Sequence, residues 1–245
     1  MLSKQPCRSF FALVCFFLFV VQVVAVPAKA KRPKDLFKNL GYKSSHEAPI
    51  SVHAKAKFMH IQAHHANIAA ARLHEVHAQI LSGPKADAHY NAAEHHKAAA
   101  NGHLRKANKH GSSIANHLAG QHGPKQSAKK ATESLHNAQR LYQHAMLGHS
   151  LMVAAQEHKL AEAAHGEAAL KAEGRGHQTI KNYHLGHKER HGKHASTNAS
   201  HALEYLNGQR TYSTQPGNDI KAALQSAEDA RSSKKMAHVT IQDHR

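Results

Sequence analysis

The sequence has no tryptophan, few aromatic residues and almost no cysteine. Aromatic residues make up 5% of the 245 residues, and both cysteines, Cys7 and Cys15, lie in an apolar N-terminal stretch. A thick aromatic core is therefore excluded. A chain that loses this stretch has no thiol for disulfides, cysteine metal sites or thiol catalysis. It must be held together by helix packing, a ligand or a metal ion.

The first 30 residues have the three-part layout of a secretory signal peptide. A short basic head precedes an apolar run over residues 10–26, and Ala28-Lys29-Ala30 gives a small-x-small exit. The alternative is a membrane anchor, but this run is shorter than the roughly 20 residues that a membrane span needs. We therefore expect cleavage near Ala25 or Ala30, no membrane span and a secreted product.

Residues 31–49 are basic and irregular, and the sequence predicts a linker there. Lys31-Arg32 could be a dibasic maturation site, with cleavage after Arg32. The same run, continued to Lys34, also fits a minimal nuclear-import pattern, and a solvated basic linker is a third interpretation. The first interpretation trims the segment, whereas the second would take the protein to a host nucleus.

Acidic residues are scarce, with 16 Asp and Glu against 33 Lys and Arg. Loss of the leader removes Lys4, Arg8 and Lys29 and lowers the formal charge from +17 to +14. An anionic partner such as a polysaccharide, a phospholipid surface or nucleic acid fits this charge. The basic residues are scattered and no base-reading motif is present, so a solvated surface is the competing interpretation.

Alanine and histidine dominate what remains, with 43 alanines and 27 histidines. Alanine, Leu, Lys, Glu and Gln favour helix, and β-branched residues are too sparse for sheets, so the sequence predicts an all-α fold. Glycine and proline breakers separate the expected helices, which cover residues 51–82, 85–119, 127–173, 177–206 and, more briefly, 218–236.

These helices predict an elongated antiparallel bundle of four long helices with a shorter C-terminal helix. The expected order is a signal peptide over 1–30, a basic linker over 31–49, the His/Ala-rich bundle over 50–206, and a loop with the last helix over 207–245. No pocket-forming apolar pattern or catalytic motif is present, so we expect a protein that is not an enzyme.

The histidines repeat with a period of seven. Eleven pairs lie seven residues apart, and His89, His96, His103, His110 and His117 form one unbroken series. Random placement would give roughly 3 such pairs. Seven residues are two helical turns, so these side chains share one stripe of each helix.

Two interpretations of the stripes remain open. In the first, histidine only packs the bundle beside an apolar seam, which in the first helix is Met59, Ala66, Leu73 and Ile80, with ring nitrogens reaching water. In the second, histidines three or four residues apart chelate transition metals, since such neighbours lie about 5–6 Å apart on one helix face.

The fourth helix carries the strongest metal signal, because histidine fills both of its seam positions. A ligand from another helix would have to complete each site. Neutral imidazole suits zinc, nickel and copper. The candidate ligands are His60, His64, His74, His77, His184, His187, His191 and His194.

Two further expectations concern the same stripes. Histidine titrates near 6.5, so we expect helicity to fall between pH 7 and 5 and zinc or nickel to oppose the fall. Asn198-Ala199-Ser200 is a glycosylation sequon, so Asn198 is a candidate acceptor, although a glycan there would compete with packing on that face.

The leader, the dibasic site and the regularly spaced alanines and histidines over residues 45–206 resemble small secreted Ala/His-rich proteins of plant-colonising fungi. One such group consists of compact helical metal-binding proteins that end in Asp-Glu-Leu-Asp, whereas this chain ends Ile241-Gln242-Asp243-His244-Arg245. The resemblance implies a secreted effector or virulence factor that acts on a host macromolecule in the apoplast or inside host cells.

The sequence therefore predicts a secreted, non-enzymatic host-interaction protein that binds several transition-metal ions through histidine, with self-association as a further expectation. One alternative is a basic effector that binds polyanions or nucleic acid inside host cells. The other is a purely structural helical protein whose packing is sensitive to pH.

Overall fold

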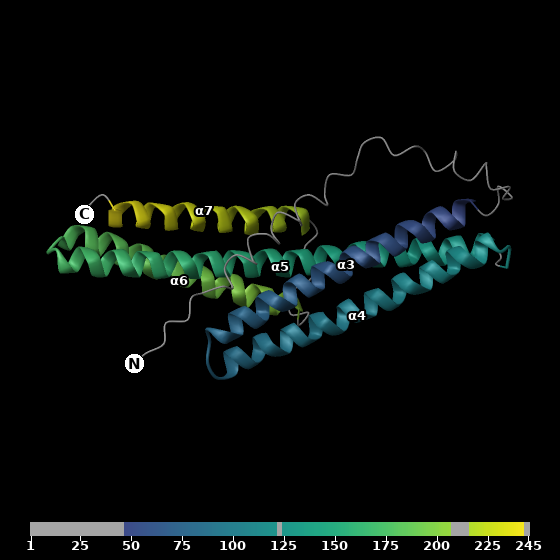
Figure 1. The fold of residues 1–245 in the computed structure, drawn as a ribbon, viewed down its shortest axis with the longest axis horizontal. Helices are drawn as coiled ribbons and strands as arrows, with labels where there is room; N and C mark the ends of the chain where they lie inside the picture. The colour runs from purple at the N-terminus through teal and green to yellow at the C-terminus, as the bar shows by residue number, and fades with distance from the viewer. Residues whose placement is uncertain (1–46, 122–123, 207–215, 243–245) are drawn as a thin grey trace, which may run out of the picture. The chain divides into compact units, whose positions relative to one another are not determined.

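The computed structural model describes residues 47–121, 124–206 and 216–242, and these residues are helical apart from short turns, with no strand among them. The expected all-α fold is confirmed (Figure 1). The predicted leader, the cleavage positions Ala30 and Arg32, and the C-terminal tail after residue 242 lie outside the described residues. The described helices are α3 (Glu47–Gln79), α4 (Pro84–Leu118), α5 (Pro124–Gly174), α6 (Gln178–Leu206) and α7 (Pro216–Gln242).

Proline and glycine mark the ends of these helices. Gly83, Gly120 and Gly176 have positive φ angles of 62°, 71° and 74° in turns next to helix ends, a conformation that favours glycine. Helices α4, α5 and α7 begin with proline. Proline suits a first turn because the N–H groups there have no intrahelical partner.

The helix boundaries correct three sequence-based expectations. The first helix begins at Glu47, so residues 47–49 belong to it and not to the predicted linker. Helix α5 begins at Pro124 instead of residue 127, and α7 continues to Gln242 instead of ending near 236. Both α3 and α5 begin earlier than expected because the first turn of a helix tolerates proline, here Pro49 and Pro124.

Helix α5 is shared by two layers of three helices. Its N-terminal half packs with α3 and α4, and its C-terminal half packs with α6 and α7. Two helix pairs are antiparallel: α3 with α4, and α5 with α6. Two are parallel: α3 with α5, and α5 with α7. We call these groups the N-layer (α3, α4 and residues 124–148) and the C-layer (residues 149–174, α6 and α7).

The buried stripe of α3 consists mainly of histidine and alanine. His53, His60 and His74 are at most 5% exposed, and alanines such as Ala56 and Ala63 are fully buried between them. The expected seam is therefore wrong in part, because Ile80 is 59% exposed and Met59 is only half-buried, although Ala66 is buried. The histidines do not flank the seam but form it.

A core with large apolar side chains lies near the middle of α5. Leu147, Leu151 and Met152 are buried there against alanines of α6 and α7, with Leu73 of α3 packed beside them. In α3, the buried His74 directly follows Leu73, so the histidine series of the N-layer reaches this cluster. The apolar cluster therefore joins the two layers, and hydrogen-bonding imidazoles fill the space within each.

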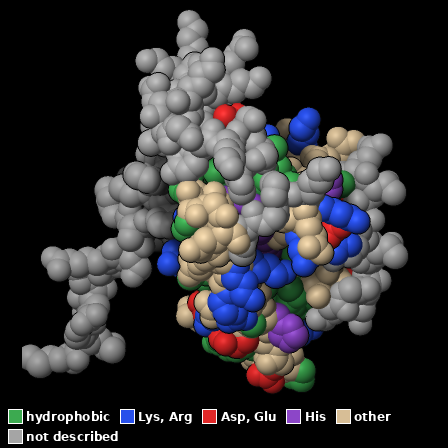
Figure 2. All heavy atoms as spheres, turned by 90° about the vertical axis from the view of Figure 1, so that its right-hand side faces the viewer, with side chains coloured by type: hydrophobic (Ala, Val, Ile, Leu, Met, Phe, Trp, Pro, Cys, Tyr) green, Lys and Arg blue, Asp and Glu red, His purple; other side chains and the backbone are tan. Residues whose placement is uncertain are grey.

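Charged side chains remain on the outside. Lysine and arginine are prominent on the face shown in Figure 2, where little histidine is visible. Several exposed cations pair with a carboxylate one turn away, as Lys193 does with Glu189 at 2.7 Å. Across the described ranges, no helix is both long enough and apolar enough to cross a membrane.

Candidate metal centre and histidine network

Histidines on antiparallel helices face each other in pairs, with the two Nδ1 atoms in hydrogen-bond contact. The five pairs have Nδ1···Nδ1 distances of 2.8–2.9 Å: His53–His110, His60–His103, His74–His89, His158–His191 and His165–His184. A hydrogen bond between two Nδ1 atoms needs one proton, so the two neutral rings of a pair must be different tautomers.

Serines on the third helix of each layer join successive pairs through the Nε2 atoms. Ser134 Oγ lies 3.0 Å from His60 Nε2 and 2.9 Å from His110 Nε2. Ser233 Oγ lies 2.9 Å from His165 Nε2 and 2.8 Å from His191 Nε2. Each hydroxyl can accept from one ring and donate to the other.

The bonds form one continuous series in each layer. We define the N-relay as His117, Ser127, His53, His110, Ser134, His60 and His103 in bonding order. The C-relay is His184, His165, Ser233, His191, His158 and Ser226. Ser127, Ser134 and Leu141 lie seven residues apart on α5. The N-relay ends at Leu141, which has no hydroxyl to continue it.

An unpartnered atom sets the direction of the C-relay. His184 Nε2 is buried without a hydrogen-bond partner. A buried N–H without a partner is rarer in proteins than an unused lone pair, so His184 carries its proton on Nδ1. Each following group then donates onward: His165 through Nε2, Ser233 through its hydroxyl, His191 through Nδ1 and His158 through Nε2.

Burial keeps these imidazoles neutral. It lowers the pKa of His60 to about 4, and the charges of His103, His110 and Lys106 lower the pKa further. Burial and then His187, His184 and His191 lower the pKa of His165 to about 4. Neutral rings are the form that both the hydrogen-bonded relays and metal coordination require.

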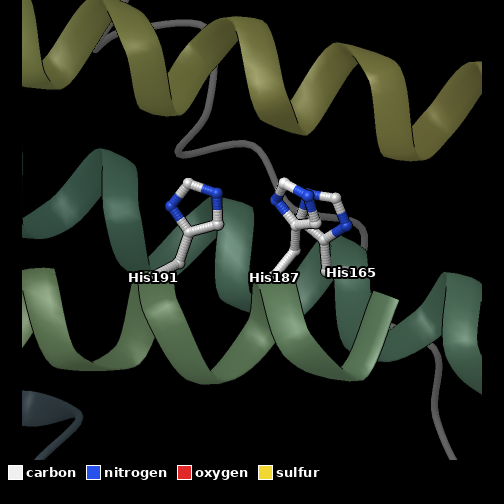
Figure 3. Close-up of side chains that lie close together, drawn as sticks. All are labelled: His165, His187 and His191. Carbon is white, nitrogen blue, oxygen red and sulfur yellow. The ribbon is translucent and has the colours of Figure 1, made fainter. Parts of the chain in front are cut away.

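Three histidines of the C-layer form the one group in the described ranges that could hold a metal ion through three or more side chains. Ligand atoms of His165, His187 and His191 lie within 4.8 Å of one another. His187 and His191 come from successive turns of α6 and His165 from α5, and all three rings point toward α7 (Figure 3). His165 and His191 are buried, and His187 is half-buried.

Ser233 marks the centre of this cluster. The Nε2 atoms of His165 and His191 converge on its hydroxyl, and His187 stacks on His165 with ring centroids 4.8 Å apart. Zn–N bonds of about 2.0–2.1 Å would place the nitrogens of a tetrahedral site about 3.3 Å apart. Metal binding thus requires small ring movements and the displacement of the serine hydroxyl.

The structure distributes the eight predicted ligands differently. His187 and His191 share the cluster, whereas His184 faces His165 and His194 stacks on His158. In α3, His60 and His74 face rings of α4, His77 packs edge-on against His89, and His64 Nδ1 lies 3.0 Å from the carbonyl oxygen of Ala100.

Sequence reasoning missed His165, although it expected a ligand from another helix. The only signal was the seven-residue spacing from His158, which places His165 on the buried stripe of α5 but does not give its register against α6. Asn198 is half-buried within α6 and not in a loop. No family model, curated protein or solved structure matches the chain.

Proposed function

We propose that the protein binds transition-metal ions through histidine, with His165, His187 and His191 as its principal ligands. The observation that carries this proposal is the convergence of three imidazoles from two helices within 4.8 Å. Zinc, nickel and copper are the ions that imidazole ligands suit. The proposal describes a non-enzymatic role for a secreted helical-bundle protein whose target is a host.

The chemistry of the three rings supports binding near neutral pH. Burial, and for each ring the neighbouring positive groups, lower the pKa values of His165, His187 and His191. Rings that are already neutral keep a lone pair for the metal at pH 7. For His165 to coordinate through Nε2, its proton must move to Nδ1 and His184 must carry its own proton on Nε2 instead, so binding at pH 7 requires a tautomer change in this pair and no net loss of a proton. Binding should weaken in acid, where protons compete with the metal for the rings.

The test compares the zinc-induced rise in melting temperature of the wild-type protein with that of two variants. A ligand that binds the folded state stabilises it by about 2.7 kcal/mol at a hundredfold excess over its dissociation constant. We expect His187→Ala to lose most of this rise, because it removes one ligand and no hydrogen bond of the relay. His194→Ala is the matched control, since it removes an exposed imidazole of the same helix that lies outside the cluster.

Two results would contradict the proposal. Zinc, nickel and copper could all leave the melting temperature of the wild-type protein unchanged, or the two variants could respond to zinc alike. Calorimetric titration of the same three proteins gives the number of ions bound, which we expect to fall by one only in His187→Ala.

A structural role for the histidines is the second candidate, and one observation favours it. Both ring nitrogens of His165 and of His191 already have hydrogen-bond partners without a metal ion. In that case the relays serve packing alone. The zinc experiment separates the two functions, because a purely structural network gives no stabilisation by the ion.

The host-directed part of the proposal is supported by the leader and by the Ala/His-rich composition. The alternative of polyanion binding is supported by the formal charge of +17. Polyanion binding would weaken steeply with added salt, whereas coordination of zinc by neutral imidazoles would depend on it much less.

A further inference from the structure

A cavity of about 330 Å³ lies where the N-layer meets the C-terminal end of α6. Residues of α3, α4, α5 and α6 line it, and none of them is acidic. It lies outside the His165, His187 and His191 cluster and shares no residue with it. A cavity of this size can hold a one-ring organic molecule.

One wall presents an imidazole whose tautomer is fixed. Asn67 Nδ2 donates to the carbonyl oxygen of Ala63 at 2.8 Å, which orients the amide so that Oδ1 faces His96 Nδ1, also at 2.8 Å. His96 therefore donates through Nδ1 and carries a lone pair on Nε2. The side chain is 5% exposed, and no bond to this Nε2 is formed within the described ranges.

A glycine keeps the space beside this atom open. A Cβ built on Gly148 would have His96 Nε2 as its nearest contact, at 3.9 Å, and both residues line the cavity. The second imidazole, His103, is the last ring of the N-relay and is 4% exposed. Its Nδ1 is engaged by His60, so Nε2 is the ring atom left for the cavity.

A cation and an apolar surface complete the lining. Lys106 is exposed beside the cavity, and among the described side chains it forms no ion pair. Its charge is close enough to lower the pKa values of His60 and His103. Leu141, Ala145 and Ala202 supply apolar contacts. One cation with a buried acceptor suits a carboxylate carrying a hydroxyl better than a phosphate, which would require more donors.

We propose that this cavity binds a small hydroxylated aromatic carboxylate. The carboxylate pairs with Lys106, the hydroxyl donates to His96 Nε2, and the ring packs on the alanines and Leu141. The site is independent of the proposed metal centre, and the two proposals can fail separately.

The test is calorimetric titration of the full chain with 4-hydroxybenzoate at pH 7 in the presence of EDTA, which removes any metal contribution. Benzoate lacks the hydroxyl donor, and 4-hydroxybenzyl alcohol lacks the carboxylate. We expect benzoate to bind about tenfold more weakly or worse, since a buried acceptor left without its hydrogen bond has roughly that effect. We expect 4-hydroxybenzyl alcohol to bind up to about fivefold more weakly, since Lys106 is exposed and its ion pair is screened by water. Equal affinity for benzoate and 4-hydroxybenzoate would overturn the assignment of His96.

Matched variants locate the site. Gly148→Leu should fill the cavity and abolish binding, whereas Gly186→Leu adds the same side chain to an exposed helical glycine with nothing within 4 Å of its Cβ. Lys106→Gln should weaken binding by up to about fivefold, and Lys109→Gln, one turn along α4, should leave it unchanged. Circular dichroism confirms that each variant is folded.

The proposal fails if the wild-type protein gives no binding heat and no shift of the ligand signals in NMR. It also fails if folded Gly148→Leu and Gly186→Leu bind 4-hydroxybenzoate equally well. Neither result would affect the zinc experiment, because the cavity and the metal centre have no side chain in common.

Discussion

At the scale of single residues, histidine occupies the buried positions that leucine or isoleucine fills in most helical bundles. His60, His74, His165 and His184 are at most 1% exposed. A buried polar group is tolerated when it is hydrogen-bonded, and each of these rings bonds a facing ring through Nδ1; His60 and His165 also bond a serine through Nε2. The alternation of tautomers along a relay follows directly from that requirement.

We therefore predict opposite tautomers within each facing pair. In the C-relay, His184 and His191 should carry the proton on Nδ1, and His165 and His158 on Nε2, because the orphaned Nε2 of His184 sets the direction. Ring ¹⁵N chemical shifts from long-range ¹H–¹⁵N correlation spectra at pH 7.5 measure this directly. The same tautomer at both members of a pair would contradict the prediction, since it leaves the Nδ1···Nδ1 contact with two protons or none.

At the scale of helices, large and small side chains alternate along each buried stripe. Ala56 and Ala63 are fully buried on α3, one turn after His53 and His60 respectively. Alanine leaves room for a ring from the facing helix, so the two helices approach closely enough for the Nδ1 atoms to meet. Packing at this density leaves little room for added atoms.

A larger side chain at a buried alanine should therefore destabilise the protein. We expect Ala56→Leu to lower the free energy of unfolding by roughly 1–3 kcal/mol through overpacking. Ala54→Leu, at an exposed position of the same helix, should change it by less than about 0.5 kcal/mol. Urea unfolding followed by circular dichroism measures both, and equal stabilities of the two variants would show that the stripe is not tightly packed.

Composition and the glycine and proline breakers were enough to predict the helices, and the heptad spacing predicted the histidine stripe on each of them. It could not predict that the stripes face inward, because histidine is also common on amphipathic surfaces. It also gave no register between helices, since a shift of seven residues preserves the pattern within each helix. Only the tertiary structure shows that His165 lies beside His187, and that Ser233 belongs to the same site.

At the scale of the whole molecule, the buried imidazoles make stability depend on pH. Burial is the largest cause of the low pKa values, and neighbouring imidazoles lower them further. The pKa is about 3 for His74 and about 4 for His158 and His89. In the unfolded chain these groups titrate near 6.5. Between those values the unfolded chain binds more protons than the folded one, so the stability that these groups contribute is full above pH 6.5 and is lost as pH falls toward 4.

We predict acid unfolding in this window. At pH 5 each deeply buried imidazole should lower the free energy of unfolding by on the order of 1–2 kcal/mol, and several together exceed the 5–15 kcal/mol typical of a domain. Helicity at 222 nm should therefore collapse between pH 6.5 and 4, with zinc shifting the midpoint to lower pH.

The control is His65→Gln, which removes an exposed imidazole and should leave the midpoint of acid unfolding in place. Full helicity retained at pH 4 in the absence of metal would contradict the prediction. Such a result would mean that the relays accept protons without breaking.

The shared helix α5 also restricts how the chain can change in length. Ser127 and Ser134 face the N-layer, and His158 and His165 face the C-layer, all on one continuous helix. Inserting one residue between these two sets would turn one layer about 100° around the helix axis relative to the other, because an α-helix has 3.6 residues per turn. An insertion of seven nearly restores the phase. Changes in the length of this segment should therefore be tolerated best in steps of two helical turns, because only such steps keep both sets of side chains facing their own layers.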